Sequence, residues 1–173
     1  FKGKTTTSLP VHVSEAAKEF DKKLQDYLKK GYAAGAALGF KGNAIGFVMT
    51  VYRKLAASSV AAIHQALINR KARLEGEILG GIKFDEIENQ DQRFFGEWEE
   101  QLYTDAKEFF EGELELLDEL IAEADGLRVD DRKLKGFIDR LITEILGSNS
   151  NEKVLIFTEY RTTQAYILSL IPI

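Results

Sequence analysis

The stretch DRKLKGFIDRLITEILGSNSNEKVLIFTEYRTTQ, residues 131–164, decides the fold predicted for this chain. Its pattern predicts an amphipathic helix, a polar turn over 147–151, an apolar strand over 154–157 and the start of a second helix. A strand that is apolar on both faces, between two helices, is typical of the start of a parallel, doubly wound sheet. Because one parallel strand cannot pair its own backbone groups, we expect the chain to be a piece of a larger protein, and a first residue that is not Met points the same way.

Two parts of the sequence resemble a known family. DRKLKGFIDRLITEIL followed by EKVLIFTEYRTTQAYIL resembles the opening of the second RecA-like lobe in helicase-like ATPases of the Swi/Snf class, within superfamily two. In that class, a strand ending in Ile-Phe-Thr/Ser and then Glu/Gln-Tyr/Phe is helicase motif IV. Upstream, Leu55-Ala-Ala-Ser-Ser-Val-Ala-Ala-Ile, followed by Leu67 and Arg70, resembles a signature on a helix just before that lobe. The resemblance is closest to the bacterial branch that includes the RNA-polymerase-associated remodelling ATPase.

The resemblance implies a fold and a division of the chain. Residues 1–127 would be a helical region that links the two ATPase lobes and protrudes from them, and residues 128–173 would begin the second lobe. The expected fold class is therefore mainly α: a bundle-like helical insertion with a short edge segment, and the first βα unit of a truncated parallel α/β lobe.

The resemblance also implies a function. The whole protein would be an ATP-dependent translocase on double-stranded DNA that displaces bound protein, in the bacterial cytoplasm at the nucleoid. The residues that match motif IV, next to the DNA backbone, are Thr158, Tyr160, Arg161 and Thr162, with Thr163 also opening the following helix. Hydroxyl groups, helix-start N–H groups and a guanidinium hold phosphates without reading sequence. The family's phosphate-binding loop, its acidic magnesium box and its arginine finger would lie outside this chain, so ATP and magnesium are expected of the whole protein only.

Composition limits the alternatives. The chain has no cysteine, which excludes disulfides and thiolate metal sites, and its two histidines, His12 and His64, have no companion spacing for zinc. The uncharged runs are too short to cross a bilayer, and the first residues do not show the basic-then-apolar pattern that predicts a secretory leader, so we do not expect secretion. Gly3-Lys4-Thr5 matches the tail of a phosphate-binding loop but leads into an extended segment instead of a helix. We therefore predict no catalytic, cofactor or metal residue in this chain.

Charge is distributed unevenly. Residues 1–83 hold 14 Lys or Arg against 6 Asp or Glu, whereas residues 84–125 hold 2 against 16. The first interpretation is a nucleic-acid face opposite a face that repels nucleic acid, and the second is simply a solvated acidic helix. A different class of function also stays open, a non-catalytic helical interaction module whose acidic block binds a basic protein partner or a second copy.

Apolar periodicity predicts four helices. Residues 5–13 predict a short extended edge segment, and Ser14 is predicted to cap a first helix that ends near Gly31. The five glycines in residues 31–46 predict a mobile loop or a broken helix. Three further helices are predicted at about 45–79, 91–124 and 128–146. The first of these three is expected to expose a polar face of Arg53, Lys54, Arg70, Lys71 and Arg73. The acidic one is expected to bury an apolar face rich in aromatic residues, made of Phe94, Phe95, Trp98, Leu102, Tyr103, Phe109, Phe110, Leu114, Leu117, Leu120 and Ile121.

Overall fold

The computed structural model describes residues 13–39, 42–76, 107–147 and 153–171. These residues form α-helices and one short π-helix, and none of them forms a β-strand. The elements are α1 (Glu15–Ala37), α2 (Gly42–Ser58), α3 (Val60–Leu74), α5 (Glu113–Val129), α6 (Arg132–Arg140), the π-helix η2 (Leu141–Leu146) and α7 (Arg161–Leu170). The prediction of a mainly α chain is confirmed.

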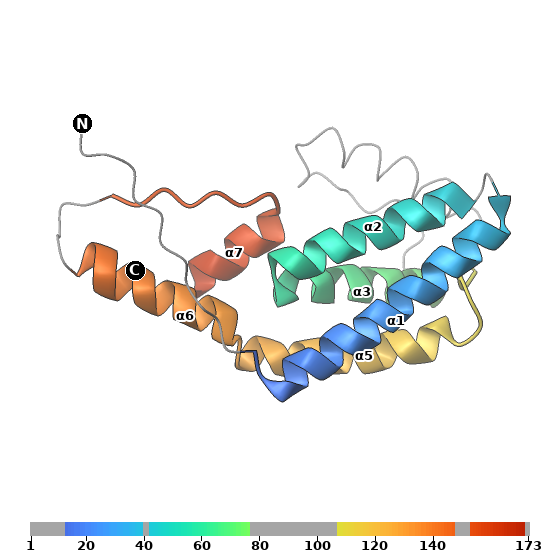
Figure 1. The fold of residues 1–173 in the computed structure, drawn as a ribbon, viewed down its shortest axis with the longest axis horizontal. Helices are drawn as coiled ribbons and strands as arrows, with labels where there is room; N and C mark the ends of the chain where they lie inside the picture. The colour runs from blue at the N-terminus through green and yellow to red at the C-terminus, as the bar shows by residue number, and fades with distance from the viewer. Residues whose placement is uncertain (1–12, 40–41, 77–106, 148–152, 172–173) are drawn as a thin grey trace.

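Four helices make a body around one core. Helix α1 packs on α2, α2 on α3, α3 on α5 and α5 on α1, so the four close into a bundle (Figure 1). We call α1, α2, α3 and α5 the helical body. Its buried core consists of Phe20, Leu24, Tyr27, Leu28, Ile45, Val48, Met49, Tyr52, Ile63, Leu67, Leu117, Leu120 and Ala124. Burial of apolar side chains from all four helices stabilises the body as one unit.

Helix α1 begins as predicted but ends later. The Ser14 hydroxyl accepts a hydrogen bond from the Ala17 N–H at 3.2 Å, which confirms the predicted cap. The predicted end near Gly31 is wrong, because α1 continues to Ala37, and of the two predictions for 31–46 the broken helix agrees with the structure, since α2 begins at Gly42. A Cβ added at Gly35 would lie 2.7 Å from the Gly42 carbonyl oxygen of α2. The glycines let α1 and α2 approach closely, and that packing offsets their low helix propensity.

The single helix predicted over 45–79 is two helices. The chain breaks at Ser59, whose hydroxyl accepts from the Ala62 N–H at 3.1 Å and caps α3. Helix α3 then turns back beneath α2 (Figure 1). The side chain of Ser59 replaces the backbone partner that a continuous helix would give. Residues 77–79 lie outside the described ranges.

A buried ion pair joins α3 to the start of α5. Glu113 is 0% exposed, and its carboxylate accepts from Arg70 Nε at 2.9 Å, from Arg70 Nη2 at 2.8 Å and from the Tyr27 hydroxyl at 2.8 Å. Burial raises the pKa of Tyr27 well above its usual value, so this hydroxyl stays a donor. The Arg70 guanidinium also lies 3.6 Å from the centre of the Phe109 ring and donates to the Lys107 carbonyl at 3.0 Å. The predicted polar face is thus wrong at Arg70, and also at Arg73, since both side chains are buried.

Among the described residues, the acidic helix both begins and ends later in the chain than predicted. Helix α5 starts at Glu113 after Gly112, which has a left-handed φ of 76°, and it passes Gly126 to end at Val129. Phe109 and Phe110 pack against the core, as predicted for the apolar face. The first five residues of that predicted face, Phe94, Phe95, Trp98, Leu102 and Tyr103, lie outside the described ranges.

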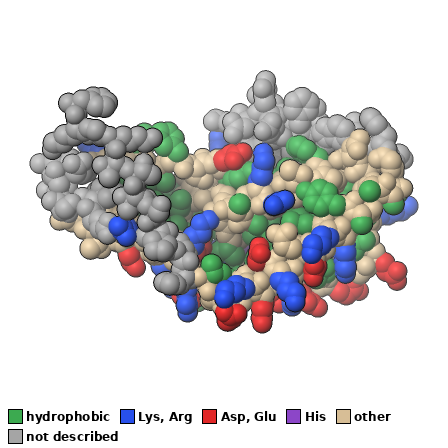
Figure 2. Space-filling view, viewed as in Figure 1, with side chains coloured by type: hydrophobic (Ala, Val, Ile, Leu, Met, Phe, Trp, Pro, Cys, Tyr) green, Lys and Arg blue, Asp and Glu red, His purple; other side chains and the backbone are tan. Residues whose placement is uncertain are grey.

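Lysines of the neighbouring helices face the carboxylates of α5. Lys23 of α1 pairs with Glu119 at 3.1 Å and also with Glu123, and Lys71 of α3 pairs with Asp118 at 2.6 Å. Figure 2 shows Lys or Arg and Asp or Glu side chains intermixed along the lower edge of the molecule. In the described residues the basic and acidic parts therefore meet inside one bundle, which favours the interpretation of a solvated helical face.

We call the last described segments of the chain the carboxyl part: α6, η2, residues 153–160 and α7. It lies at one end of the helical body (Figure 1). The predicted helix over 128–146 starts later, because α5 continues to Val129 and the Asp131 carboxylate caps α6 by accepting from the Leu134 N–H at 3.0 Å. The predicted domain boundary between residues 127 and 128 stays a prediction.

The buried strand predicted over 154–157 is wrong for the described part of the chain. Residues 153–160 form neither helix nor strand, and the side chains of Leu155 and Phe157 are 77% and 84% exposed. An apolar run becomes a buried strand only where neighbouring strands pair its backbone and helices cover its faces. No described segment provides such a pairing strand. The predicted edge segment 5–13 lies outside the described ranges apart from Val13.

Among the helices of the described ranges, none combines the length and the hydropathy that crossing a bilayer requires.

Candidate coupling site between the α2–α3 junction and α7

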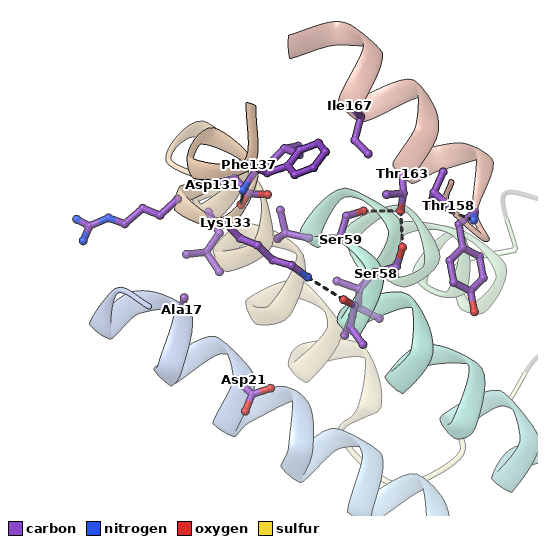
Figure 3. Close-up of a pocket in the computed structure, with 18 of the residues that line it drawn as sticks. Ala17, Asp21, Ser58, Ser59, Asp131, Lys133, Phe137, Thr158, Thr163 and Ile167 are labelled. Atoms are coloured by element: carbon purple, nitrogen blue, oxygen red, sulfur yellow. Dashed lines mark hydrogen bonds between the residues drawn. The ribbon is translucent and has the colours of Figure 1, made fainter. Parts of the chain in front are cut away.

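The two stretches that resemble the family meet in space. The Thr163 hydroxyl of α7 lies 2.8 Å from the Ser58 hydroxyl and 2.8 Å from the Ser59 hydroxyl, across more than 100 residues of sequence (Figure 3). Ser59 and Thr163 are both buried. We call Ser58, Ser59 and Thr163 the hydroxyl cluster. It gives the buried Thr163 hydroxyl two partners at the α2–α3 junction, so it fixes where α7 sits on the helical body.

Local structure explains why these side chains converge. Ser58 is the last residue of α2, and Ser59 has an extended backbone where the chain turns into α3. Small side chains at this junction let the backbone of α7 come close. Both serine hydroxyls lie within hydrogen-bonding distance of the Thr163 hydroxyl.

A second set of contacts holds α7 through the end of α5. The Nη1 of Arg128 lies 3.2 Å from Nδ1 of His64 in α3, and the Tyr166 hydroxyl of α7 donates to the Arg128 carbonyl at 3.2 Å. The Arg128 guanidinium lies 6.0 Å from the centre of the Tyr166 ring. Burial and the nearby Asp131 raise the pKa of Tyr166 to about 12, and burial and Arg128 lower the pKa of His64. Helix α7 is thus joined to both α3 and α5.

The four predicted DNA-contacting residues do not share one environment. Tyr160 is buried, Thr158 and Thr162 are half-buried, and Arg161 is exposed. The Thr158 hydroxyl accepts from the Tyr160 N–H at 3.4 Å, so part of its hydrogen-bonding capacity is used within the chain. Arg161 and Thr162 open α7, which starts without a hydrogen bond from a capping side chain. Arg161, Thr162 and the first N–H groups of α7 are therefore the groups best placed to meet a phosphate.

A groove of about 1020 Å³ lies between the two parts of the molecule. Its walls come from the start of α1, the α2–α3 junction, the start of α6, residues 156–160 and α7 (Figure 3). Lys133 of α6 reaches across it and donates to the Ala57 carbonyl at 2.9 Å. The charged side chains around the groove carry both signs: Lys54, Arg132, Lys133, Asp21, Asp130, Asp131 and Glu159. The groove therefore has no excess of positive charge of the kind that attracts a phosphate backbone.

The described residues contain no metal site. No group of three or more His, Cys, Asp or Glu side chains in these ranges is arranged to hold an ion. ATP and magnesium therefore stay expectations for the whole protein.

Comparisons with known proteins add no identification. Neither the family models nor the curated proteins nor the solved structures give a significant match to this chain. The resemblance to Swi/Snf-class ATPases thus rests on the residues quoted above.

Sequence reasoning missed the contacts that organise the site. The Glu113–Arg70 pair and the His64–Arg128–Tyr166 contacts each join residues far apart in the chain, and no local pattern marks them. The one available signal was the match of Arg70 to the upstream signature, and that match does not identify the partner of Arg70.

Proposed function

We propose that this chain is part of an ATP-dependent translocase on double-stranded DNA, in which it couples the helical region to the second ATPase lobe and contacts the DNA backbone. The observation that carries the proposal is the hydroxyl cluster, because it joins the two stretches on which the family resemblance rests. Hydrolysis itself would depend on groups outside this chain.

Coupling follows from the unequal stiffness of the two parts. The helical body has a shared core and the buried Arg70–Glu113 pair, so it moves as a unit. Helix α7 is attached to it by the hydroxyl cluster and by the Tyr166 and Arg128 contacts. A displacement of α7 during a cycle of ATP binding and hydrolysis would therefore be passed to the α2–α3 junction and on to the body.

DNA contact would be made at the start of α7. The exposed Arg161 guanidinium supplies positive charge, and Thr162 and the uncapped N–H groups supply donors. The exposed carboxylate of Glu159 lies two residues away in sequence and opposes this attraction. We therefore expect weak binding by the isolated chain, strongly reduced by salt, with sequence-independent contact.

The proposal is tested by DNA-stimulated ATP hydrolysis in the protein that contains this chain. Thr163→Val keeps the side-chain shape and removes the hydroxyl, so we expect a lower stimulation by DNA with little change in the DNA-independent rate. Ser169→Ala is the matched control, because Ser169 is an exposed hydroxyl on the same helix that donates only to the Tyr166 carbonyl at 2.7 Å in the described contacts. Absence of any DNA-stimulated ATP hydrolysis in that protein would refute the proposal.

The described carboxylates of α5 do not favour the alternative function, an acidic module that binds a basic partner. Asp118, Glu119 and Glu123 already have lysine partners within the chain, so these carboxylates of α5 are not held open for a basic partner.

A further inference from the structure

We propose that His64, Arg128 and Tyr166 form an acid-sensitive latch, which holds α7 on the helical body while His64 is neutral and releases it when His64 takes up a proton. The inference is independent of the proposed function, since it concerns only contacts within this chain.

The geometry fixes the protonation state of the closed latch. Arg128 Nη1 lies 3.2 Å from His64 Nδ1, and a guanidinium carries only donors. Nδ1 must therefore be the unprotonated acceptor, with the ring proton on Nε2. A proton on Nδ1 would remove this hydrogen bond and place a cation on the buried His64 ring, 6% exposed, in contact with the exposed Arg128 guanidinium.

The charged groups around His64 show where Arg128 would go. From α5, Arg128 opposes protonation, whereas Asp125 favours it more weakly. Asp125 Oδ1 lies 3.7 Å from Arg128 Nη1, so it can hold the guanidinium once His64 repels it. From α7, Tyr166 stays neutral because its pKa is about 12, and Asp131 at the start of α6 lies beside that hydroxyl. Arg128 thus keeps an existing ion-pair partner, the exposed Asp125, when it leaves His64.

Movement of Arg128 reaches α7 through Tyr166. The Tyr166 hydroxyl donates to the Arg128 carbonyl, and its ring lies beside the Arg128 guanidinium. Loss of the His64 contact therefore loosens the residue on which Tyr166 rests. The hydroxyl cluster remains as a second attachment, so we expect more frequent opening of α7 and not unfolding of the body.

The direction of the pH effect follows from linkage. Burial, followed by Arg128, lowers the pKa of His64 below 6.5 in the closed state, and opening returns it toward 6.5. The open state therefore binds more protons, so the latch is at full strength above about pH 7 and weakens as the pH falls below about 6.5. Each pH unit between the two pKa values changes the opening equilibrium up to about tenfold.

Amide hydrogen exchange measures this opening. Protection factors of α7 amides would be compared at about pH 7.5 and about pH 5.5, with α1 amides as the internal reference. Division by the intrinsic exchange rate removes the ordinary pH dependence of the chemistry. We expect α7 protection to fall several-fold at the lower pH while α1 protection stays constant.

Histidine variants show which histidine causes the pH-dependent change in α7 protection. Since the chain has two histidines, His12→Gln is the matched control and should keep the response. His64→Gln keeps an acceptor for Arg128 but cannot titrate, so the response should disappear. An unchanged α7 protection in the native chain, or the same response in His64→Gln, would overturn the proposal.

Two further variants keep the test decisive if His64→Gln folds poorly. Arg128→Gln removes the cation that protonated His64 would meet but leaves the burial of His64, so it should reduce the pH response although His64 is intact. Tyr166→Phe removes the hydroxyl that ties α7 to the Arg128 carbonyl, so it should lower α7 protection at both pH values and reduce the pH response. A full response in Arg128→Gln would show that some group other than this latch is titrating.

Discussion

The helical body and the carboxyl part are both apolar in sequence but differ in how they bury those residues. The body places its apolar side chains in one core and adds a fully buried ion pair. In the carboxyl part, the most apolar run of the sequence, residues 154–157, leaves Leu155 and Phe157 mostly exposed. Apolar sequence therefore produces a core only where the chain also supplies partners for it, and stability should be concentrated in the body.

We expect the largest loss of stability when the buried Arg70–Glu113 ion pair of the helical body is broken. Glu113→Ala leaves the buried Arg70 guanidinium without its carboxylate, so we expect the free energy of unfolding to fall by about 3–5 kcal/mol. Urea unfolding followed by circular dichroism measures this change. Glu115→Ala, at an exposed position of the same helix, is the control and should change stability by less than about 0.5 kcal/mol. Equal effects of the two variants would contradict a body organised around Glu113.

Two glycines separate the effect of close helix packing on stability from the effect of low helix propensity. Gly35→Ala puts a methyl group 2.7 Å from the Gly42 carbonyl oxygen, so forcing α1 and α2 apart should cost about 1–3 kcal/mol. Gly126→Ala in α5 meets nothing within 4 Å and should stabilise the chain by up to about 1 kcal/mol. Thermal unfolding of both variants tests the opposite signs. Stabilisation by Gly35→Ala would show that the close approach of α1 and α2 is wrong.

An exposed aromatic residue tests the carboxyl part. Phe157→Ser removes a side chain that the described residues leave 84% exposed, so we expect a change in unfolding free energy within about 0.5 kcal/mol. Phe20→Ser, in the core of the body, should cost about 3 kcal/mol or more. A large loss with Phe157→Ser in the same urea experiment would show that residues 154–157 have a buried role in this chain.

The sequence predicted the features that depend on residues close together in the chain, and it missed those that depend on contacts between distant segments. Amphipathic patterns and the Ser14 cap predicted helices and core faces, because each depends on residues within a few turns of one another. The end of α1 was misplaced, since helix propensity says nothing of the α2 backbone against which Gly35 packs. The strand over 154–157 was predicted from its apolar residues and from the resemblance to motif IV, with its partner strands expected outside this chain, and no described segment supplies a partner. In the site, the residues of the hydroxyl cluster were singled out by resemblance, but their contact could not be read from spacing.

The contact between Ser58 and Thr163 is the central element of the account, and a double-mutant cycle tests it most directly. Ser58→Ala, Thr163→Val and the pair would be compared through the protection of α7 amides against hydrogen exchange. The account predicts non-additive effects, with a coupling energy of about 0.5–1 kcal/mol, because either single variant removes the same hydrogen bond. Strictly additive effects would contradict it, since α7 would then not be held at the α2–α3 junction through these hydroxyl groups.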